Sequence, residues 1–319
     1  MKYDIYFHDD FDGRASAAVM LDFLNSRGDE IEHFTHIDFD IQDQYFKDNF
    51  FSSHKFFKGK RNPPIVVDFP YHPKTAFWFD HHTTAFKRED WKKQFHSSKN
   101  YRWDEHYPSC CHFIVNSLLK DFGYKPSKII LELAKWLDVI DAARYSSAKQ
   151  TILNKEPALK VNLFIEDGMK GITEKDFIKL LASKSLIEIS KNKLVEKVVK
   201  KNKIETKNGL KFYKKNIKIY GSLGMIFLKK GKYTSLRFAP FYFYQNLRYF
   251  LRIVEDKNKT FGIGLGVNPW NKNKNKIHIG EFLKENFLGA GGHHEAGGAG
   301  FKTKKDLELA IKKIIENFS

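Results

Sequence analysis

Three short apolar stretches near the start of the chain each run directly into acidic or imidazole side chains. They cover residues 2–7, 64–67 and 75–79, and each is rich in the β-branched and aromatic residues that form buried strands. Open α/β sheets bind their ligands beyond the carboxyl ends of parallel strands, where such polar groups collect. The pattern therefore predicts an α/β fold in which helices flank a mostly parallel sheet.

The segment after the first stretch, residues 8–13, contains a histidine, three aspartates and a glycine. Side chains two positions apart share a face of an extended chain, so we expect His8, Asp10 and Asp12 to project together. A helix predicted over residues 15–26 completes a strand–turn–helix unit, and its N-terminus favours an anion. The alternative is an acidic turn in which Asp12 caps the helix, although a cap needs only one acid.

The other two stretches end in Asp68 and in Asp80-His81-His82. An acid and two imidazoles at the end of a buried strand are poorly placed for packing. They are well placed to bind a divalent cation or a phosphate. The carboxyl edge of the predicted sheet is therefore the candidate functional site.

Two predicted helices follow, one that opens at Ser109, a suitable N-cap, and one that begins near residue 126. The second has one apolar face and ends near two more acids, Asp138 and Asp141. Either acid could join the candidate site.

The character of the sequence changes after a lysine-rich stretch, residues 172–201, that we expect to be helical. We place a domain boundary between residues 193 and 215, which gives a first domain of residues 1–200 and a second of residues 215–319. Strand-like segments in the second domain predict a smaller α/β domain with a mixed sheet. These segments are residues 216–220, 225–228, 248–254 and 260–267.

A glycine-rich segment, residues 288–298, precedes the terminal helix and contains two histidines and a glutamate. Glycine permits unusual backbone angles and lets main-chain N–H groups approach a ligand closely. A flexible linker would not explain the embedded histidines, so we interpret this loop as ligand-binding. Residues 271–276 alternate Asn and Lys and are expected to form a mobile basic loop.

The composition says more about the cellular environment of the protein than about its activity. The net charge of +17 is compatible with a polyanionic ligand, although a lysine-rich composition alone can produce it. We find no apolar run of membrane-spanning length and expect no secretory signal. The two cysteines, Cys110 and Cys111, are adjacent, which excludes a disulfide framework and an ordinary thiolate zinc site. We interpret both as packing residues and expect a cytoplasmic protein.

The candidate ligands are all carboxylates and imidazoles, which suit Mn²⁺ or Mg²⁺ better than a structural zinc. They are His8, Asp10, Asp12, Asp68, His81 and one of Asp138 or Asp141. Their number exceeds what one ion needs, and a carboxylate such as Asp68 could bridge two. Two ions about 3.5–4 Å apart can activate water and neutralise the charge of a phosphoryl group.

Four ordered motifs resemble those of the DHH phosphoesterase superfamily. They are His8-Asp9-Asp10-Phe11-Asp12-Gly13, Val67-Asp68, Asp80-His81-His82 and the glycine loop at residues 290–298, the last similar to the Gly-Gly-Gly-His motif of the DHH-associated C-terminal domain. The resemblance spans nearly the whole chain. The segment Asp141-Ala142-Ala143-Arg144-Tyr145 resembles the family's Asp-Thr-Gly-x-Phe pattern, so we assign Asp141 as the fourth-motif acid and keep Asp138 as the alternative.

The resemblance implies a role for each candidate residue. It implies one ion held by His8, Asp10 and Asp68, and a second held by Asp12, Asp68, His81 and Asp141. It further implies that Asp80 orients the imidazoles and that His82 faces the substrate phosphate. In the second domain, His293, Gly291 and Gly292 would bind the substrate phosphate.

One departure from the family concerns its Ser-Leu-Arg-Ser strand before the glycine loop. At that place this chain has residues 264–268, which contain no arginine. A Ser235-Leu236-Arg237 occurs, but too early in the chain. Asn268 or Arg252 is our candidate replacement for the family arginine.

We therefore predict a manganese-dependent phosphodiesterase or exonuclease-type hydrolase of short oligonucleotides or small nucleotides, with two Mn²⁺ ions and Mg²⁺ as the alternative. The chain is closest in size to the oligoribonuclease/pAp-phosphatase subgroup. A cyclic-dinucleotide phosphodiesterase, a polyphosphatase and a single-strand-specific exonuclease are alternatives. A non-catalytic nucleic-acid-binding protein is a different class, against which the intact ligand set argues. The sequence leaves open whether the substrate is RNA or DNA, from which end it is cleaved, and whether the protein forms an oligomer such as a homodimer. No membrane partner is expected.

Overall fold

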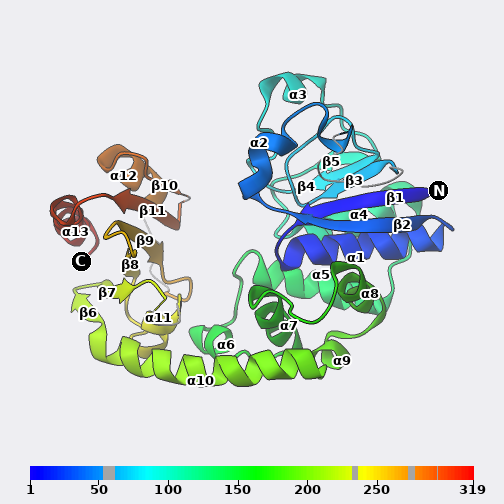
Figure 1. Cartoon of the computed structure of the whole chain (residues 1–319). Coiled ribbons are helices and arrows are strands. Elements are labelled where there is room, and N and C mark those ends of the chain that lie inside the picture. Colours follow the sequence, from blue (N-terminus) through cyan, green and yellow to red (C-terminus); the bar gives the residue numbers. More distant parts are fainter. Residues whose placement is uncertain (53–61, 232–235, 272–276, 293) are drawn as a thin grey trace. The chain divides into compact units, whose positions relative to one another are not determined.

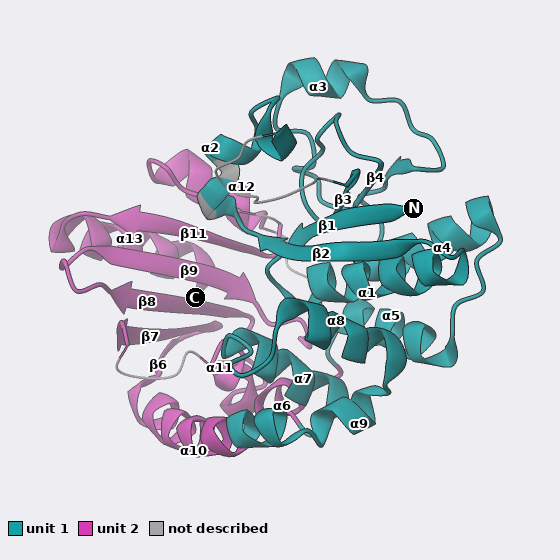
Figure 2. Ribbon diagram, turned by 45° about the vertical axis from the view of Figure 1, so that its right-hand side comes forward, with its two compact units in different colours: residues 1–145, 155–199 teal, residues 146–154, 200–319 magenta. Residues whose placement is uncertain are grey.

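The computed structural model describes residues 1–52, 62–231, 236–271, 277–292 and 294–319. The described chain forms two compact units, one of residues 1–145 and 155–199 and one of residues 146–154 and 200–319 (Figure 2). The last crossing from the first unit to the second falls within a single helix, α10 (Lys193–Asn216). The segment that we placed between two domains is therefore helical.

The first unit is built on a five-stranded sheet in which all neighbouring strands are parallel (Figure 1). The spatial order is β2 (Glu30–Ile37), β1 (Lys2–His8), β3 (Pro64–Val67), β4 (Phe77–Asp80) and β5 (Tyr101–Trp103). This confirms the predicted fold class. The chain runs from β1 to β2 on one side and then to β3 on the other, so the strand order reverses between β1 and β3. Open α/β sheets bind their ligands at such a reversal.

Alternate side chains of these strands enter two separate cores. Ile5, Phe7 and Val67 belong to the core that the sheet shares with one group of helices. These helices are α1 (Phe11–Ser26), α4 (Cys110–Phe122), α5 (Lys128–Ile140), α7 (Pro157–Glu166), α8 (Glu174–Ser183) and α9 (Leu186–Ser190). Tyr6 and Trp78, by contrast, belong to an aromatic cluster on the opposite face. Both faces of the parallel sheet are thus covered, as such sheets require.

The aromatic cluster is carried by short helical segments rather than by long helices (Figure 1). These segments are η1 (Phe39–Ile41), α2 (Gln42–Tyr45), η2 (Phe50–Ser52) and α3 (Glu89–Gln94). The helical stretch expected over residues 172–201 is in fact broken into α8, α9 and α10. A break occurs at Ser185, whose side chain forms a capping box with Glu188 and so starts a new helix.

The second unit contains a sheet that is mixed, as predicted, and has six described strands, of which only β7 and β8 form a parallel pair. The spatial order is β10 (Gly291–Gly292), β11 (Ala296–Phe301), β9 (Phe261–Val267), β8 (Tyr249–Glu255), β7 (Leu223–Lys229) and β6 (Lys218–Tyr220). The segment expected as a glycine-rich loop therefore supplies two strands. In these strands Gly291 pairs with Gly298 and Gly292 with Gly297.

Helices cover both faces of this second sheet. They are α6 (Ala148–Leu153), α11 (Ala239–Phe243), α12 (Ile279–Asn286) and α13 (Lys304–Phe318). Leu283 of α12 and Ile314 of α13 join one core with Leu251 and Ile263 of the sheet. Phe241 of α11 joins the other core. Of the predicted basic loop, residues 272–276 lie outside the described residues, as does His293.

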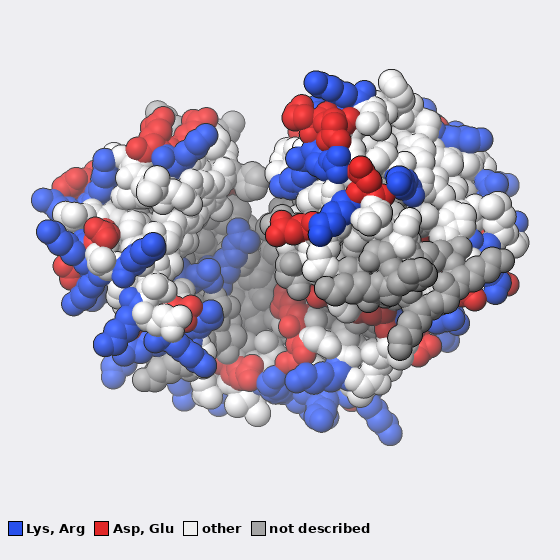
Figure 3. All heavy atoms as spheres, turned by 45° about the horizontal axis from the view of Figure 1, so that its top comes forward, with Lys and Arg blue, Asp and Glu red and all other residues white. Residues whose placement is uncertain are grey.

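Lys and Arg side chains are spread over the visible surface of each unit and are interspersed with Asp and Glu (Figure 3). The positive net charge therefore forms no single continuous patch on that face. No described helix combines the length and apolarity needed to cross a membrane.

Candidate metal centre

The turn between β1 and α1 brings the first group of candidate ligands together. Helix α1 begins at Phe11, four positions earlier than predicted, because the Asp10 side chain caps it by accepting from the Gly13 N–H over 2.8 Å. Asp12 therefore lies in the first helical turn and not in an extended chain as expected, and the alternative in which Asp12 caps the helix is wrong as well. Gly13 allows the close packing of helix on strand, since a Cβ there would lie 2.2 Å from the carbonyl oxygen of His8.

Asp12 is buried against the N-terminus of α4. Its two carboxylate oxygens accept from the backbone N–H groups of Cys110, over 2.6 Å, and Cys111, over 3.0 Å. Burial, together with the charges of Asp141 and Asp10, raises the pKa of Asp12 well above its usual value. The small, buried cysteines pack as predicted, and burial raises the pKa of both thiols, which makes them inert.

Asp68 directly follows β3 and has a left-handed backbone, with φ of 56°. Its side chain is 1% exposed, yet neither carboxylate oxygen has a hydrogen-bond partner among the described residues. The nearest imidazole nitrogens are His81 Nε2 and His82 Nδ1, each 3.6 Å from Oδ1, and His8 Nδ1, 3.8 Å from Oδ2. Burial and the neighbouring carboxylates raise its pKa well above the usual value. Bare, buried oxygens that repel their neighbours are what a cation would satisfy.

Asp80, at the end of β4, fixes the two histidines that follow. Its Oδ1 accepts from the backbone N–H groups of His81, over 2.8 Å, and His82, over 3.2 Å. The same oxygen lies 2.8 Å from His82 Nδ1, so that ring nitrogen carries the proton. Burial lowers the pKa of His82, but the bond to Asp80 and the charges of Asp80, Asp141 and Asp10 together outweigh it, so the pKa is raised.

His81 is oriented from the other side. Its Nδ1 lies 2.9 Å from the carbonyl oxygen of Tyr107 and must donate to it, which leaves Nε2 with a free lone pair. Nε2 is buried and has no hydrogen-bond partner among the described residues. It lies 3.5 to 3.6 Å from carboxylate oxygens of Asp12, Asp68 and Asp141. An imidazole held in this tautomer is ready to act as a ligand.

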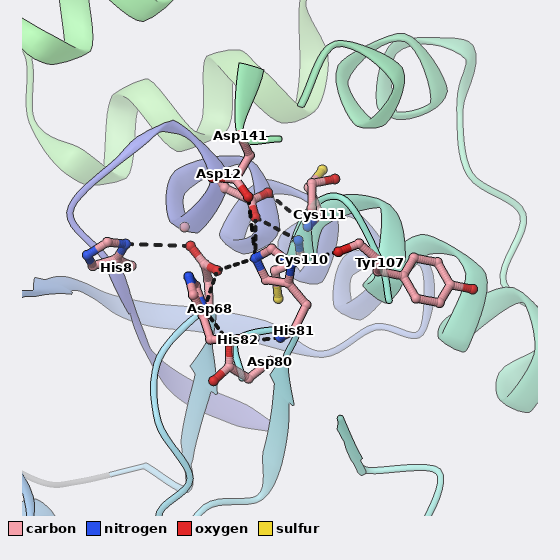
Figure 4. A network of polar contacts seen from close by, with 12 residues as sticks. His8, Asp12, Asp68, Asp80, His81, His82, Tyr107, Cys110, Cys111 and Asp141 are labelled. Carbon is pink, nitrogen blue, oxygen red and sulfur yellow. Dashed lines mark hydrogen bonds and ion pairs between the residues drawn. The ribbon is translucent and has the colours of Figure 1, made fainter. Parts of the chain in front are cut away.

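Three overlapping groups of side chains meet at this edge of the sheet, each with its ligand atoms within 4.8 Å of one another (Figure 4). The groups are His8, Asp10 and Asp68; Asp12, His81 and Asp141; and Asp68, His81 and His82. His8 and Asp10 contact each other directly, with 2.8 Å between Nδ1 and Oδ2. All donors are oxygen or imidazole nitrogen, so the set fits one or two hard divalent cations.

Asp141 and Asp138, the two candidates for the fourth-motif acid, have different surroundings. Asp141 lies beside His81, whereas Asp138 accepts from Ser109 Oγ over 2.7 Å and pairs with His112 Nδ1 over 2.5 Å. Ala143 has a left-handed backbone, with φ of 51°, a conformation that favours glycine. It occupies the place of the glycine in the Asp-Thr-Gly-x-Phe pattern, which agrees with Asp141 as the motif's acid.

Comparisons with known proteins identify the fold. No family model matches the sequence, and no curated protein matches it. Among solved structures, the pGpG-specific phosphodiesterase PggH from Vibrio cholerae matches with a TM-score of 0.72 and 18% identity, over 99% of this chain and 98% of that one. The DHH domain of a protein assigned to a family of ribosomal proteins matches with a TM-score of 0.58 and 15% identity, over 98% and 86%. This chain has the DHH fold.

A third structure with the same architecture is the exonuclease RecJ bound to manganese, with a TM-score of 0.51 and 13% identity over 99% of this chain and 89% of that one.

The second unit contains the glycines that we expected to bind the substrate phosphate. Gly292 has φ of 152° and a Cβ there would lie 2.3 Å from the carbonyl oxygen of Ala296, so only glycine fits. Gly291 pairs with Gly298, and a Cβ there would meet nothing within 4 Å.

One part of the site was missed by sequence reasoning. Arg14 is buried and donates to Glu174 through Nε, over 2.9 Å, and to the backbone oxygen of Asp10 through Nη1, over 3.1 Å. It also pairs with Asp9, which supports the turn. Arg14 and Glu174 are 160 positions apart, and no local pattern signals their contact.

Proposed function

We propose that this chain is a two-metal phosphoesterase that hydrolyses ester bonds of short oligonucleotides or small nucleotides, with Mn²⁺ as its preferred ion and Mg²⁺ as the alternative. The observation that carries the proposal is Asp68. Its two buried oxygens, which have no hydrogen-bond partner in the part of the chain that the structure describes, face His8 on one side and His81 on the other. A carboxylate in that position can be shared by two ions.

In this proposal the two ligand groups hold one ion each. His8, Asp10 and Asp68 hold the first, and Asp12, Asp68, His81 and Asp141 hold the second. The chain prepares these side chains through contacts that leave ligand atoms available. Asp10 is tied down by Gly13, Asp12 by the N-terminus of α4, and His81 by Tyr107. Such orientation by hydrogen-bonded neighbours typically contributes about 10- to 100-fold to metal affinity.

His82 and Asp80 serve the substrate side of the same site. The His82 side chain is 39% exposed and Asp80 holds its Nδ1, so in the imidazolium form that its raised pKa favours, Nε2 can donate to a phosphate oxygen. Asp80 thereby orients the His82 imidazole and holds the backbone of His81 without being a ligand itself. A bound pair of divalent ions supplies an activated water and neutralises charge on the phosphoryl group.

The comparisons support the choice of substrate class. PggH is described as pGpG-specific and RecJ as an exonuclease, and the chain covers 98% and 89% of those two structures. We therefore propose linear dinucleotides as the first substrates to test. We also propose residues 1–200 as the catalytic domain and residues 215–319 as a substrate-binding domain in which Gly291, Gly292 and His293 contact phosphate. Two buried, unpaired cysteines suit the reducing, cytoplasmic setting that we propose.

The test is a hydrolysis panel with purified protein and added Mn²⁺. The panel contains linear dinucleotides, short RNA and DNA labelled at either end, pAp, cyclic di-AMP and polyphosphate. We expect turnover of dinucleotides and of chains of two to five nucleotides to exceed that of long single strands. Faster degradation of long single-stranded DNA would instead identify a processive exonuclease.

The control is the variant Asp68→Ala together with the wild type after exhaustive chelation. Both should lose turnover, because a shared carboxylate and the ions that it holds are removed together. Full activity in either sample would refute the two-metal proposal.

A further inference from the structure

Strand β9 of the second unit has glycine at every second position of its interior. Gly262, Gly264 and Gly266 share one face of the sheet, whereas Ile263 and Leu265 on the other face are buried in the core. Glycine weakens a strand because it loses more backbone entropy on folding than other residues and has no side chain to pack. A row of three glycines on one strand face therefore calls for an explanation.

The fold itself does not require glycine at these positions. None of the three has a positive φ. A Cβ at Gly262 would meet nothing within 4 Å, and the nearest atoms to a Cβ at Gly264 and Gly266 would lie 3.8 Å away. At Gly297 on the adjacent strand, by contrast, a Cβ would lie 2.6 Å from the carbonyl oxygen of Gly291. The bare surface of β9 is thus not explained by packing within the described chain.

A pocket of about 260 Å³ lies over Gly264 and Gly266. Its lining residues come from β8, β9, β11 and the α11 region, all within the second unit (Figure 2). They are Arg237, Phe238, Phe241, Phe250, Arg252, Gly264, Leu265, Gly266, Val267, Ala296 and Gly297. The floor is therefore main chain, and the walls are aromatic.

Two arginines give the pocket its charge. Arg252 on β8 is directly paired with Gly264 on β9, and its guanidinium would lie 3.8 Å from a Cβ at that glycine. The Arg237 guanidinium lies 5.1 Å from the centre of the Phe238 ring. No acidic residue is among the described lining residues. A planar guanidinium is suited to bidentate recognition of phosphate and to stacking on aromatic rings.

We infer that this pocket binds one nucleotide unit, with its base lying flat over the glycine strip and its phosphate on Arg252 and Arg237. A flat ring can approach main chain that carries no Cβ, and the phenylalanines offer the sequence-tolerant contact that bases make with aromatic walls. The volume is just below the range of about 300–1,000 Å³ found for drug-sized ligands, which suits one nucleotide unit better than two. The inference deepens the proposed function, on which it rests, by assigning a place for a base of the substrate.

The test uses the full-length protein in EDTA, so that binding is measured without the metal centre. Titration calorimetry with GMP, AMP and UMP should detect binding, and ribose 5-phosphate should bind at least tenfold more weakly. The variants Gly264→Val and Gly266→Val should weaken mononucleotide binding at least tenfold while leaving the melting temperature unchanged or raised. Gly262→Val is the matched control, since it lies on the same strand face but outside the lining, and it should bind like the wild type.

The variant Arg252→Met tests the phosphate contact separately from the base contact. In that variant the affinity for GMP should fall at least tenfold towards that for guanosine, because only Arg237 is left on the phosphate, while guanosine itself binds as to the wild type. If a valine variant unfolds, the corresponding alanine variant replaces it, because one methyl group already enters the pocket. Absence of mononucleotide binding to the metal-free wild type, or wild-type binding by the Gly264 and Gly266 variants, would overturn the inference.

Hydrolysis measured on the same proteins with Mn²⁺ distinguishes the two claims. Hydrolysis by the wild type with an unchanged KM in the Gly264 and Gly266 variants would refute the nucleotide pocket and leave the phosphoesterase intact. Metal-free mononucleotide binding that is lost in those variants, without hydrolysis under any condition, would refute the phosphoesterase and leave the pocket intact.

Discussion

The backbone N–H of Cys110 donates to the carboxylate of Asp12 over 2.6 Å, although the two residues are 98 positions apart. The bond joins the N-terminus of α4 to the first turn of α1. A helix N-terminus stabilises a nearby anion, so this arrangement offsets part of the cost of burying the Asp12 charge. The rest of that free-energy cost, together with the cost of burying the Asp68 and Asp141 carboxylates, destabilises the metal-free centre.

We therefore predict that Asp68→Asn stabilises the metal-free protein while abolishing activity. The amide removes one buried charge from a group whose pKa values are raised by burial and mutual repulsion, and asparagine tolerates the left-handed backbone at this position. A gain of about 1 kcal/mol would raise Tm by roughly 2–4 °C for a unit of this size. Thermal melts in EDTA measure the gain. A fall in Tm under those conditions would contradict our view of the centre.

The second prediction compares Asp141→Asn with Asp138→Asn. Asp141 lies beside His81 at the centre, so its variant should lose most of its turnover with little loss of stability. Asp138 instead holds Ser109 and His112, so its variant should lose stability and keep most of its turnover. Hydrolysis assays and urea unfolding on both proteins test the pair. The reverse pattern would move the fourth motif to Asp138.

The third prediction is that Ala143→Gly stabilises the protein. Alanine at φ of 51° is strained, whereas glycine adopts that angle without a Cβ penalty. The relief outweighs the greater flexibility of glycine in the unfolded chain, giving a net gain of about 0.5–1 kcal/mol. Urea unfolding measures it, with Ala142→Gly as the neighbouring control, which should be destabilising. Loss of stability in Ala143→Gly would rule out strain at this turn.

The fourth prediction concerns His72, which is buried among aromatic rings. Its Nδ1 accepts from the Lys74 N–H over 3.2 Å and its Nε2 lies 3.3 Å from the Lys47 carbonyl oxygen, so the ring is neutral. Burial lowers its pKa to about 4. The unfolded chain then binds a proton that the folded chain does not, so stability is lost as pH falls from about 6.5 to 4, by roughly 3 kcal/mol in all.

Urea unfolding across that range, with His72→Gln as the comparison, isolates this loss. The glutamine amide can still donate to Lys47 but does not titrate, so its stability should fall less on acidification. Asp12 and Asp68 of the centre act in the opposite direction, because their raised pKa values favour the folded state as they take up protons. An identical pH profile for the wild type and His72→Gln would exclude the role of His72.

The sequence was informative where a local pattern decides the structure. Strands β3 and β4 are short buried runs, and the polar residues that follow them lie close together, as expected from their place at the strand ends. It was misleading at residues 8–13, where an extended chain was assumed but the Asp10 cap starts α1 early. It was silent on contacts such as Arg14 with Glu174, which depend on how distant segments pack. The alternating glycines of β9 can be read from the sequence, but the pocket beside them depends on the fold.

The three groups of ligands at the metal centre come from four separate segments of the chain, between His8 and Asp141, and each group draws on at least two of them. These segments meet only when β1, β3 and β4 have paired and the end of α5 has docked beside them. Completion of the centre and assembly of the first unit are therefore a single event. The affinity of a refolding intermediate for a divalent ion would report, without any substrate, whether the sheet has formed in its native strand order.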